Sequence, residues 1–570
     1  MERYDLDVHP SEQRLADFSA GRRLFVITAL TIPIGALSAC VAWALLRAIG
    51  FITNGVFYHR IDTRLVAPDS THHNPLLVLA APVVGGLVIG LLARFGSEKI
   101  RGHGMPEALE AILVGGSKVA PRVAVLKPLA SAVAIGTGGP FGAEGPIIMT
   151  GGACGSLLAQ FVHLTSDERK TLLVSGAAAG MAATFNAPLA SVLLAVELLL
   201  FEWRPRSYVP VVSAVATATV LRGYLLGHGA LFAASHAPIH VNATVVSLCA
   251  ASGIISGLLA IAATALVYAS EDGFARLRVH WMWWPAIGGA IIGLGGLVVP
   301  QALGVGYDVI GAELDGSISL GLVVGILIVK TLIWSLSLGS GTSGGVLAPM
   351  FMVGGALGAL EAHVFPSVAP GFWPLVALAG VLGGIMRAPL TGVAFAVELT
   401  HRLDAVLPLL VGASAAYALS VVFLKRSVLT EKIARRGYHL SREYDVDPLE
   451  VLLVREVMSP AVGVAVTGRP SVVAYEGETL RTVAYRMAES GLLTLPVVAS
   501  ADGRRVVGTI SLPQLLEGRL RDLREARHAE RVLTFRRPSA PTVGVCGSPW
   551  PRRRSTENEE SPSFRTPSRR

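Results

Sequence analysis

A single acidic residue interrupts a long apolar stretch of the chain. Glu144 lies in the segment Gly142–Pro146 (GAEGP), and no other charged residue occurs between positions 128 and 161. Glycine frees the backbone and proline suits the first turn of a helix, so the pattern predicts a helix that begins here. The first N–H groups of a helix have no partner within it and attract negative charge. We therefore predict an anion site at Gly142, Ala143 and Gly145.

Glu144 is itself an anion at this helix start, and its role has two interpretations. A deprotonated carboxylate would fill the anion site and close it, whereas a protonated one would lose its attraction to the N–H groups and swing away. Alternatively, the acid only stabilises the start of the helix. Because an ionisable group is costly inside an apolar span and usually has a function there, we favour the gate.

A second segment of this kind is Gly102–Glu107 (GHGMPE), where two glycines again precede a proline. The alternative is a surface turn before a short helix. If the segment binds an anion, a neutral imidazole can donate one hydrogen bond to it, and a protonated imidazole adds charge. The candidate binding residues are Gly102, His103, Gly104 and Met105.

A third segment is Gly341–Pro349 (GTSGGVLAP), followed by an apolar helix over Met350–Leu360. It has the same arrangement of glycines before a proline, and the backbone N–H groups at its end are candidate anion donors. The candidate residues are Gly345, Val346 and Leu347.

Ser343 gives this third segment a competing interpretation. Gly-x-Ser-Gly within a membrane span resembles the nucleophile motif of rhomboid-type intramembrane proteases. Such a serine needs a histidine on a neighbouring span to activate it. His103, His163 and His363 are the candidates, and an intramembrane serine protease centred on Ser343 is therefore the alternative to anion binding.

These segments have to be positioned by helices that cross a membrane. Of the 570 residues, 52% are hydrophobic and only 15% are charged, against about 25% charged in soluble domains. The mean hydropathy is +0.57. A spanning helix needs about 20 apolar residues, and several stretches qualify. The clearest are Leu24–Leu46, Leu76–Leu92, Ser247–Tyr268, Trp284–Val299, Leu320–Leu338 and Val406–Leu424.

The membrane part contains an internal repeat of about 200 residues, which is typical of transporters. Residues 187–198 align without gaps to residues 388–399, with eight of twelve positions identical. Gly102 and Gly104 answer Gly304 and Gly306, and we match Gly142–Pro146 to Gly341–Gly345. The two repeats run over about 24–226 and 243–424.

Charge and composition divide the rest of the chain. Residues 1–23 are predicted to be a cytoplasmic lead, and residues 534–570 a disordered basic tail without the apolar content to fold. Positive clusters before the first span and after the last place both termini in the cytoplasm, in a plasma (inner) membrane protein. They explain the net charge of +8, so no nucleic acid partner is expected. The four cysteines have no metal-ligand spacing, and no metal site is predicted.

The motifs Gly102–Glu107, Gly142–Pro146, Phe185–Leu189 and Gly345–Pro349 resemble, in this order, the signature segments of the CLC family of chloride channels and chloride/proton antiporters. The resemblance covers about residues 24–437. It implies an all-α polytopic membrane protein with an inverted repeat of tilted and broken helices. It also implies a homodimer with a separate anion pathway in each subunit. Glu144 matches the gating glutamate of the family.

The sequence departs from the family pattern at several positions. His103 stands where the family often has serine, and Leu347 where phenylalanine is usual. Leu198 occupies the position of an internal proton-transfer glutamate. Glu202, four residues on and hence on the same helix face, is the candidate substitute. No tyrosine stands near Leu429, where the family has its inner-gate phenol.

Residues 454–520 are charged, alternate in polarity, and resemble a cystathionine-β-synthase (CBS) module. We expect a small cytoplasmic α/β module there. Such modules pair to bind adenine nucleotides, and with a single copy the pairing would occur across the dimer. A nucleotide cofactor and a purely structural dimer contact both remain open.

Together these patterns predict a transporter and not an enzyme. The expected function is transport of chloride or a similar small inorganic anion, as a channel or as a chloride/proton antiporter gated by Glu144. A transporter of organic anions is disfavoured because backbone amides at close quarters suit a small ion. The expected partners are chloride, protons, membrane lipid and a second copy of the chain.

Overall fold

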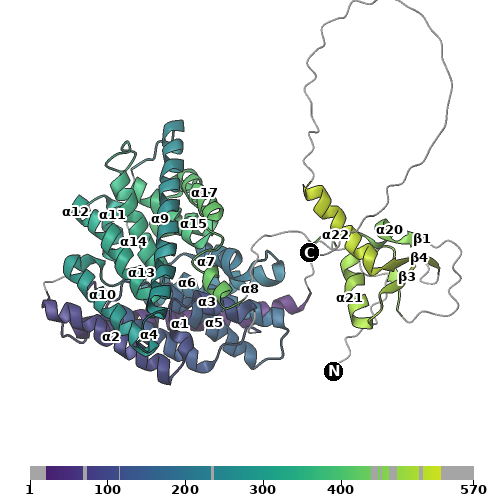
Figure 1. Cartoon of the computed structure of the whole chain (residues 1–570), viewed down its shortest axis with the longest axis horizontal. Helices are drawn as coiled ribbons and strands as arrows, with labels where there is room; N and C mark the ends of the chain where they lie inside the picture. The colour runs from purple at the N-terminus through teal and green to yellow at the C-terminus, as the bar shows by residue number, and fades with distance from the viewer. Residues whose placement is uncertain are drawn as a thin grey trace, which may run out of the picture. The chain divides into compact units, whose positions relative to one another are not determined.

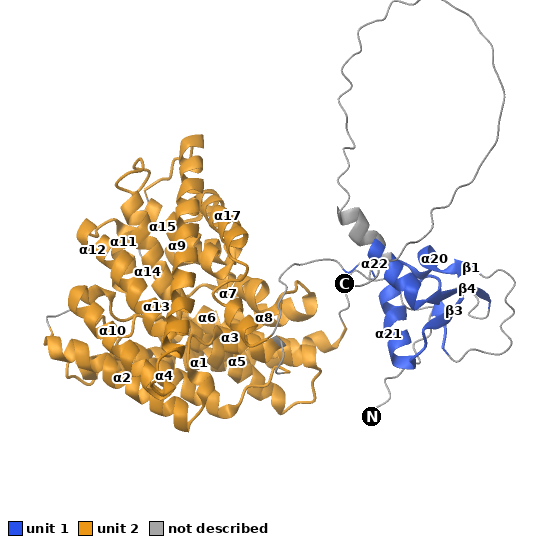
Figure 2. Ribbon diagram, in the orientation of Figure 1, with its two compact units in different colours: residues 1–14, 446–570 blue, residues 15–445 orange. Residues whose placement is uncertain are grey.

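The structure is a computed structural model that describes residues 21–68, 73–113, 116–232, 237–437, 447, 449, 452–460, 472–499 and 505–527. The chain divides into two compact units (Figure 2), one formed by residues 15–445 and the other by residues 1–14 with 446–570. The predicted tail at 534–570 and most of the predicted lead at 1–23 lie outside the described residues.

The larger unit is helical throughout its described part (Figure 1). Its first half contains α1 (Arg23–Phe57), α2 (Pro75–Phe95), η2 (Glu98–Ile100), α3 (Met105–Leu113), α4 (Pro121–Gly136), α5 (Glu144–Gln160), α6 (Ser166–Phe185), α7 (Pro188–Leu194), η3 (Ala195–Leu200) and α8 (Pro205–Leu226). Its second half contains α9 (Ala243–Ala275), η4 (Trp281–Trp283), α10 (Trp284–Val298), η5 (Pro300–Ala302), α11 (Tyr307–Asp315), α12 (Leu320–Gly325), η6 (Ile326–Lys330), α13 (Thr331–Gly339), α14 (Leu347–Glu361), α15 (Phe372–Met386), α16 (Pro389–Thr400), η7 (Leu403–Ala405), α17 (Val406–Phe423) and α18 (Thr430–Arg435).

Among the described residues, seven helices are long and apolar enough to cross a membrane. Six of them match the stretches predicted from the sequence to within one residue at their C-terminal ends or contain them, and the seventh is α8, where prolines and polar residues dilute the apolar signal. Their outer faces carry exposed apolar side chains such as Phe25, Leu76 and Val220. Surfaces of this kind are suited to contact with lipid or with another membrane protein.

The helices that follow the glycine-rich segments are shorter and lie inside the unit. In α5 and α14 nearly every side chain is buried. Small residues allow this packing. A Cβ atom on Gly151 of α5 would lie 2.3 Å from the carbonyl oxygen of Gly176 in α6, and one on Gly358 of α14 would lie 2.2 Å from that of Trp373 in α15. Close backbone approach through glycine is typical of helices that pack within membranes.

The two halves are joined through α7 and α16. The start of each of these helices is capped by an acid from the other half of the unit, Glu398 for α7 and Glu197 of η3 for α16. Glu197 accepts hydrogen bonds from the backbone N–H and the hydroxyl of Thr391, at 2.8 and 2.6 Å. Glu398 accepts from the backbone N–H groups of Leu189 and Ala190, both at 2.8 Å. A carboxylate at a helix N-terminus satisfies N–H groups that have no partner in the helix. These repeat-related acids thus have a structural role at the junction of the halves.

The smaller unit has a four-stranded sheet in the order β1-β4-β3-β2. Its described elements are α20 (Val454–Val457), β1 (Ser459–Pro460), β2 (Ala474–Tyr475), α21 (Leu480–Ser490), β3 (Thr494–Val498), β4 (Val506–Ser511) and α22 (Leu512–Arg527). Apolar residues of α21 and the strands, among them Leu480, Val483 and Ile510, form its core. At the edge of this core, the Arg486 guanidinium lies 2.8 Å from the carboxylate of Glu478. The hydrogen-bonded ion pair raises the pKa of Arg486 above its ordinary value.

Candidate anion site

The glycine-rich segments predicted from the sequence meet at one place in the membrane unit. Gly142 and Gly345 pair as an isolated antiparallel bridge, in which the Gly345 N–H donates to the Gly142 carbonyl at 2.8 Å. The Gly102 N–H donates to the Gly341 carbonyl at 3.4 Å. A Cβ atom on Gly145 would lie 1.9 Å from the His103 carbonyl oxygen. Segments far apart in the sequence therefore contact one another through backbone atoms.

Helices begin at this meeting point, and their first N–H groups are unpaired within the helix. In α3, α5 and α14 the first helical hydrogen bonds run from Ala108, Ile147 and Met350 to the carbonyls four residues before them. A proline, which has no N–H to leave unsatisfied, stands directly before the donors Ile147 and Met350 and two residues before Ala108. The remaining amides at the starts of α5 and α14 form a backbone cradle for negative charge.

The carboxylate of Glu144 lies inside this cradle. The residue is fully buried, and a Cβ atom on Gly142 or Gly345 would lie 1.7 or 2.4 Å from its Oε2 atom. The backbone N–H groups of Glu144 and Ala348 face the carboxylate, yet neither forms a hydrogen bond of full geometry, and both oxygens lack a hydrogen-bond partner among the described residues. The acid thus lies at the helix starts while bound only loosely to them.

His103 lies at the start of α3, with 4% of its surface exposed. Its Nδ1 atom has no hydrogen-bond partner among the described residues. Lys127, Lys432 and Arg436 add positive charge around it, and Glu107 adds negative charge. The neighbouring Gly102 has a φ of +77°, and a Cβ atom there would lie 2.7 Å from the Lys432 ammonium. The positive surroundings and the free ring nitrogen make His103 a suitable neighbour for an anion.

Two buried lysines support the glycine loops, and the sequence analysis missed both. The Lys127 ammonium donates to the carbonyls of Ile100 and Gly102 at 2.9 and 2.6 Å. In the second half, the Lys330 ammonium donates to Ala302 and Gly304 at 2.9 and 2.8 Å. Both side chains are fully buried. The available signal was a lysine at the same place in each repeat, 203 positions apart.

The structure corrects the register of the repeat at Glu144. We had matched Gly142–Pro146 to Gly341–Gly345. Glu144 begins α5 and Leu347 begins α14, and Gly142 bridges to Gly345. The structural counterpart of Gly142–Pro146 is therefore Gly345–Pro349. The glycine runs at Gly341 and Gly344 made a shifted alignment look equally good, and the helix starts resolve it.

The prediction that Glu202 shares a helix face with Leu198 is wrong. The helix η3 ends at Leu200, and Phe201 adopts a left-handed conformation with a φ of +54°. Glu202 therefore lies beyond the helix, where its carboxylate accepts a hydrogen bond from Ser207 and lies 3.7 Å from Arg204. Proximity in sequence could not reveal this because the break falls between the two residues.

The position near Leu429, where a tyrosine was missing, receives a phenol from elsewhere. Leu429 is 1% exposed. The hydroxyl of Tyr268, from α9, donates to the adjacent Val428 carbonyl at 2.5 Å. A tyrosine 160 positions away in sequence thus contacts the backbone next to Leu429, a contact that pattern matching along the chain could not find.

Ser343 lies at the site without the partner that a protease requires. Its hydroxyl is 2.8 Å from that of Ser131, and no imidazole contacts it among the described residues. Two serine hydroxyls can exchange a hydrogen bond, but neither is a base that would activate the other at neutral pH. The geometry does not support the protease alternative. In the part of the chain that the structure describes, no cluster of three or more metal-ligating acids, histidines or cysteines occurs.

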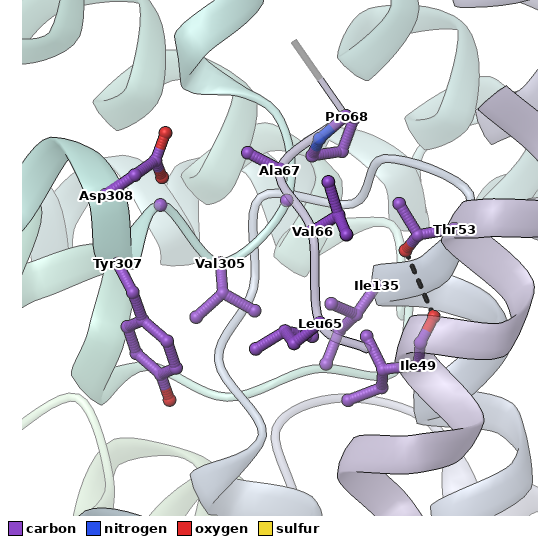
Figure 3. A pocket seen from close by; sticks show the side chains of 12 residues that line it. Ile49, Thr53, Leu65, Val66, Ala67, Pro68, Ile135, Val305, Tyr307 and Asp308 are labelled. Carbon is purple, nitrogen blue, oxygen red and sulfur yellow. Dashed lines mark hydrogen bonds between the residues drawn. The ribbon is translucent and has the colours of Figure 1, made fainter. Parts of the chain in front are cut away.

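A cavity of about 190 Å³ opens at the glycine loop of the second half (Figure 3). Figure 3 shows the ring of Tyr307 along one side of it, facing Val305 and Leu65, while the carboxylate of Asp308 points away from the ring. Tyr307 thus lines the cavity with its ring and carries a buried hydroxyl without a hydrogen-bond partner among the described residues.

A duplicated bundle whose broken helices direct their N-termini at a central point defines a membrane transport protein. The family model described as voltage gated chloride channel matches residues 85–421, and the CBS domain model matches residues 454–520. The chain belongs to the voltage-gated chloride channel (CLC) family, as the sequence motifs predicted.

Relatives and solved structures agree with this assignment. The chain is 30% identical to a voltage-gated ClC-type chloride channel ClcB of Citrobacter koseri, over 72% of this chain and 99% of that protein. It is 31% identical to an H(+)/Cl(-) exchange transporter ClcA of Yersinia pestis, over 59% and 73%. The structure resembles a slow cyanobacterial Cl−/H+ antiporter, with a TM-score of 0.65 and 22% identity over 73% of this chain and 99% of that one. It also resembles a CLC-type fluoride/proton antiporter, with a TM-score of 0.63 and 19% identity over 72% and 98%. The predicted fold class is confirmed.

Proposed function

We propose that the protein transports chloride or a similar small inorganic anion across the membrane, and that Glu144 gates a pathway within each subunit. The observation that carries the proposal is the fully buried Glu144 carboxylate at the starts of α5 and α14, without a hydrogen-bond partner among the described residues. Membership of the CLC family supports anion transport.

The chemistry of the gate follows from competition for the same N–H groups. The ionised carboxylate of Glu144 is attracted to the positive ends of α5 and α14 and excludes another anion. Protonation removes that attraction, so the side chain leaves and an anion takes its place. Gly142 lies on one side of the carboxylate and Gly345 on the other. Because neither has a side chain, they leave room for an ion to bind backbone amides directly. The proposed anion-binding residues are Gly102, His103, Gly104, Met105, Gly142, Ala143, Gly145, Gly345, Val346 and Leu347.

Whether protons are exchanged for anions depends on a second group that can carry a proton. Relatives include both channels and H(+)/Cl(-) exchange transporters. Leu198, where such an acid is usual in antiporters, cannot carry one. Glu202 is the proposed substitute because its side chain is 21% exposed and so is in reach of solvent protons. Its position beyond the helix break means that it would exchange protons with solvent and not within the helix.

The assembly and its location complete the proposal. The exposed apolar faces of the spanning helices suit lipid and a second copy of the chain. Positive residues flanking the first and last spans favour cytoplasmic termini in the plasma (inner) membrane. An adenine nucleotide at the CBS module remains a prediction.

The substitution Glu144→Gln tests the gate in purified protein reconstituted into liposomes. The neutral amide keeps the shape of the side chain but cannot titrate, so the variant should retain anion flux while losing its dependence on pH and any proton coupling. Anion efflux and external pH are recorded together. In the wild-type protein, uphill proton movement driven by a chloride gradient would identify an antiporter, and its absence a channel.

The matched control is Glu361→Gln on α14. Glu361 is also buried, and its carboxylate accepts a hydrogen bond from Ser252 at 2.5 Å, away from the helix starts. This variant should keep the pH-dependence of the wild-type protein. Proton coupling that survives in Glu144→Gln would remove Glu144 from the role of gate, and a wild-type protein without anion flux would refute the function itself.

A further inference from the structure

A basic and aromatic surface lies where α2 ends and η4 packs against it. A Cβ atom on Gly90 of α2 would lie 2.0 Å from the Met282 carbonyl oxygen of η4. The guanidinium of Arg94, in the last turn of α2, lies 3.2 Å from the Nε2 atom of His280. We call this surface the α2–η4 patch, and it comprises Arg94, Lys99, Arg276, Arg278, His280 and Trp283.

Positive charge on the patch exceeds the negative charge beside it. Its four lysine and arginine side chains are exposed, and none of them forms an ion pair among the described residues. Two acids of the same segments already have partners, since Glu98 lies 3.1 Å from Arg101 and Asp272 accepts hydrogen bonds from Arg435. The third acid, Glu271, is half-buried. An excess of exposed cations attracts an anionic partner.

The aromatic side chains place the patch at the level of the lipid headgroups. Trp283 is 47% exposed, and Phe95, the last residue of α2, is 77% exposed. Tryptophan is enriched where a membrane meets water, because its ring is apolar and its N–H is polar. The spans α1 and α2 are consecutive, so α2 ends on the side where α1 begins. This is the side that we propose to be cytoplasmic.

An anionic phospholipid matches both the charge and the apolar surface of the patch. Guanidinium groups bind phosphate oxygens through paired hydrogen bonds, and Arg94 and Arg278 supply two such groups. Beside these cations, Leu277 and Val279 are 43% and 45% exposed and suit contact with acyl chains. A free phosphate ion would leave these apolar side chains uncovered. Basic clusters next to spanning helices bind anionic headgroups in this way.

Arg101 connects the patch to the anion site. Its guanidinium lies 4.7 and 5.5 Å from the ring centres of Trp281 and Trp284. The same guanidinium packs on the third glycine segment, since a Cβ atom on Gly341 would lie 2.9 Å from its Nε and Nη2 atoms. The next residue, Gly102, donates its N–H to the Gly341 carbonyl at 3.4 Å. A shift of η4 would therefore act on the loop before α3.

We propose that the α2–η4 patch binds the phosphate group of an anionic phospholipid. The bound lipid fixes η4 beside Arg101 and thereby keeps the loop before α3 in place for transport. The binding site stands on the contacts of the patch alone, whereas its effect on anion flux rests on the proposed function.

The double variant Arg94→Gln/Arg278→Gln tests binding by native mass spectrometry of the full chain in a neutral detergent. The wild-type protein should bind dioleoyl phosphatidylglycerol more tightly than dioleoyl phosphatidylcholine. In the variant this preference should fall by about tenfold or more, because each cation near a lipid surface contributes about a fivefold gain in affinity. The matched control is Arg22→Gln/Lys118→Gln, which also removes two exposed positive charges.

The control residues lie beside α6, whereas the patch lies beside α2. The chain next to the first of them, at Arg23, pairs with Glu168 at 2.9 Å, and the chain next to the second, at Gly116, accepts a hydrogen bond from Arg169 at 3.3 Å. The control variant should keep the wild-type preference. Equal affinity of the wild-type protein for both lipids, or the same loss in both double variants, would overturn the site. Lipid that inorganic phosphate displaces better than chloride at equal ionic strength would mean a phosphate site, which also contradicts the proposal.

Anion efflux from liposomes tests the coupling to the anion site. Wild-type efflux should be faster with phosphatidylglycerol in the membrane than in pure phosphatidylcholine, and the control variant should keep this ratio. In Arg94→Gln/Arg278→Gln the ratio should fall. An unchanged ratio in a variant that has lost lipid binding would overturn the coupling. A wild-type protein without flux in either membrane would refute the proposed transport function, while the binding measurement still decides whether the lipid site exists.

Discussion

The loop before α3 and the loop before α11 are anchored in the same way, but they differ in how much positive charge surrounds the acid nearby. In each half, a buried lysine donates to two carbonyls of the glycine loop, from Lys127 in the first and Lys330 in the second. The acid near Lys127 is Glu107, which Lys432 and Arg436 approach at 3.4 and 2.9 Å. The acid near Lys330 is Glu313, which forms no ion pair among the described residues.

This difference indicates what each half does with its acid. In the first half positive charge is in excess, so Glu107 remains ionised and ties α3 to α18. In the second half Glu313 is fully buried, and neither of its carboxylate oxygens has a hydrogen-bond partner among the described residues. A shortage of charge is what makes a buried acid respond to protons. Both halves therefore keep the lysine as a backbone anchor, and we expect only the acid of the second half to respond to protons.

The largest difference is expected between Lys330→Met and Lys127→Met. Both variants lose two hydrogen bonds from an ammonium to backbone carbonyls. Lys330→Met also removes a buried positive charge from the surroundings of the buried Glu313 carboxylate, and an uncompensated buried charge is expected to destabilise the fold further. Lys127→Met leaves Glu107 with Lys432 and Arg436. Thermal unfolding in detergent should therefore show a far lower transition temperature for Lys330→Met.

Neutralising the acid should rescue this loss. The double variant Lys330→Met/Glu313→Gln is expected to recover a substantial part of the stability, because the carboxylate that needed the lysine is gone. Equal losses in the two single variants, or no recovery in the double variant, would mean that the lysines act only as backbone anchors in both halves.

A smaller difference is expected between alanine substitutions at the repeat-related glycines Gly355 and Gly152. A Cβ atom on Gly355 would lie 2.1 Å from the Glu313 carboxylate, whereas one on Gly152 would lie 3.2 Å from a methyl group of Leu173. Both positions are inside helices, where alanine is favoured by about 1 kcal/mol. Gly152→Ala should be close to neutral. Gly355→Ala should lose about 1–3 kcal/mol through overpacking.

The Gly355→Ala variant also has a transport readout that packing alone would not change. Displacing the Glu313 carboxylate alters its interaction with Lys330, so the midpoint of the flux–pH curve should move, while that of Gly152→Ala should not. Chemical denaturation and liposome flux on the same preparations measure both quantities. A midpoint that is the same in both variants would argue that the position of Glu313 is irrelevant to the gate.

The parts of the site that could be predicted from sequence are those encoded by neighbouring residues. Glycines before a proline specify a helix start within a few positions, so the sequence predicted the breaks that begin at Gly102, Gly142 and Gly341. Glu144 could be singled out from sequence because it is an acid within a long apolar stretch, a feature that is visible without knowing its contacts. The repeat at residues 187–198 was long enough to be aligned without gaps.

The parts that were missed depend on contacts between distant residues. Glu313 is unremarkable along the chain, and the only signal for Lys330 is its repeat counterpart Lys127, 203 positions away. The register at Glu144 was shifted because several glycines gave equivalent matches, and only backbone pairing of Gly142 with Gly345 distinguishes them. Glu202 was assigned to a helix face that ends before it, because a left-handed residue at Phe201 is not evident from its type.

The smallest difference is expected between the acids that cap α7 and α16. In Glu197, Oε2 accepts the bonds from both the backbone N–H and the hydroxyl of Thr391, and the carbonyl oxygen of a glutamine can keep both of these bonds. In Glu398, each oxygen accepts from a different backbone N–H, and the glutamine NH2 would then face a donor. Glu398→Gln should cost about 1–2 kcal/mol and Glu197→Gln less than about 1 kcal/mol, measured by thermal unfolding.

Neither variant should alter the flux–pH curve, because both acids serve helix starts away from Lys330. A shifted midpoint in Glu197→Gln alone would place this acid, next to Leu198, on the proton route and make it a second point at which the halves diverge in function.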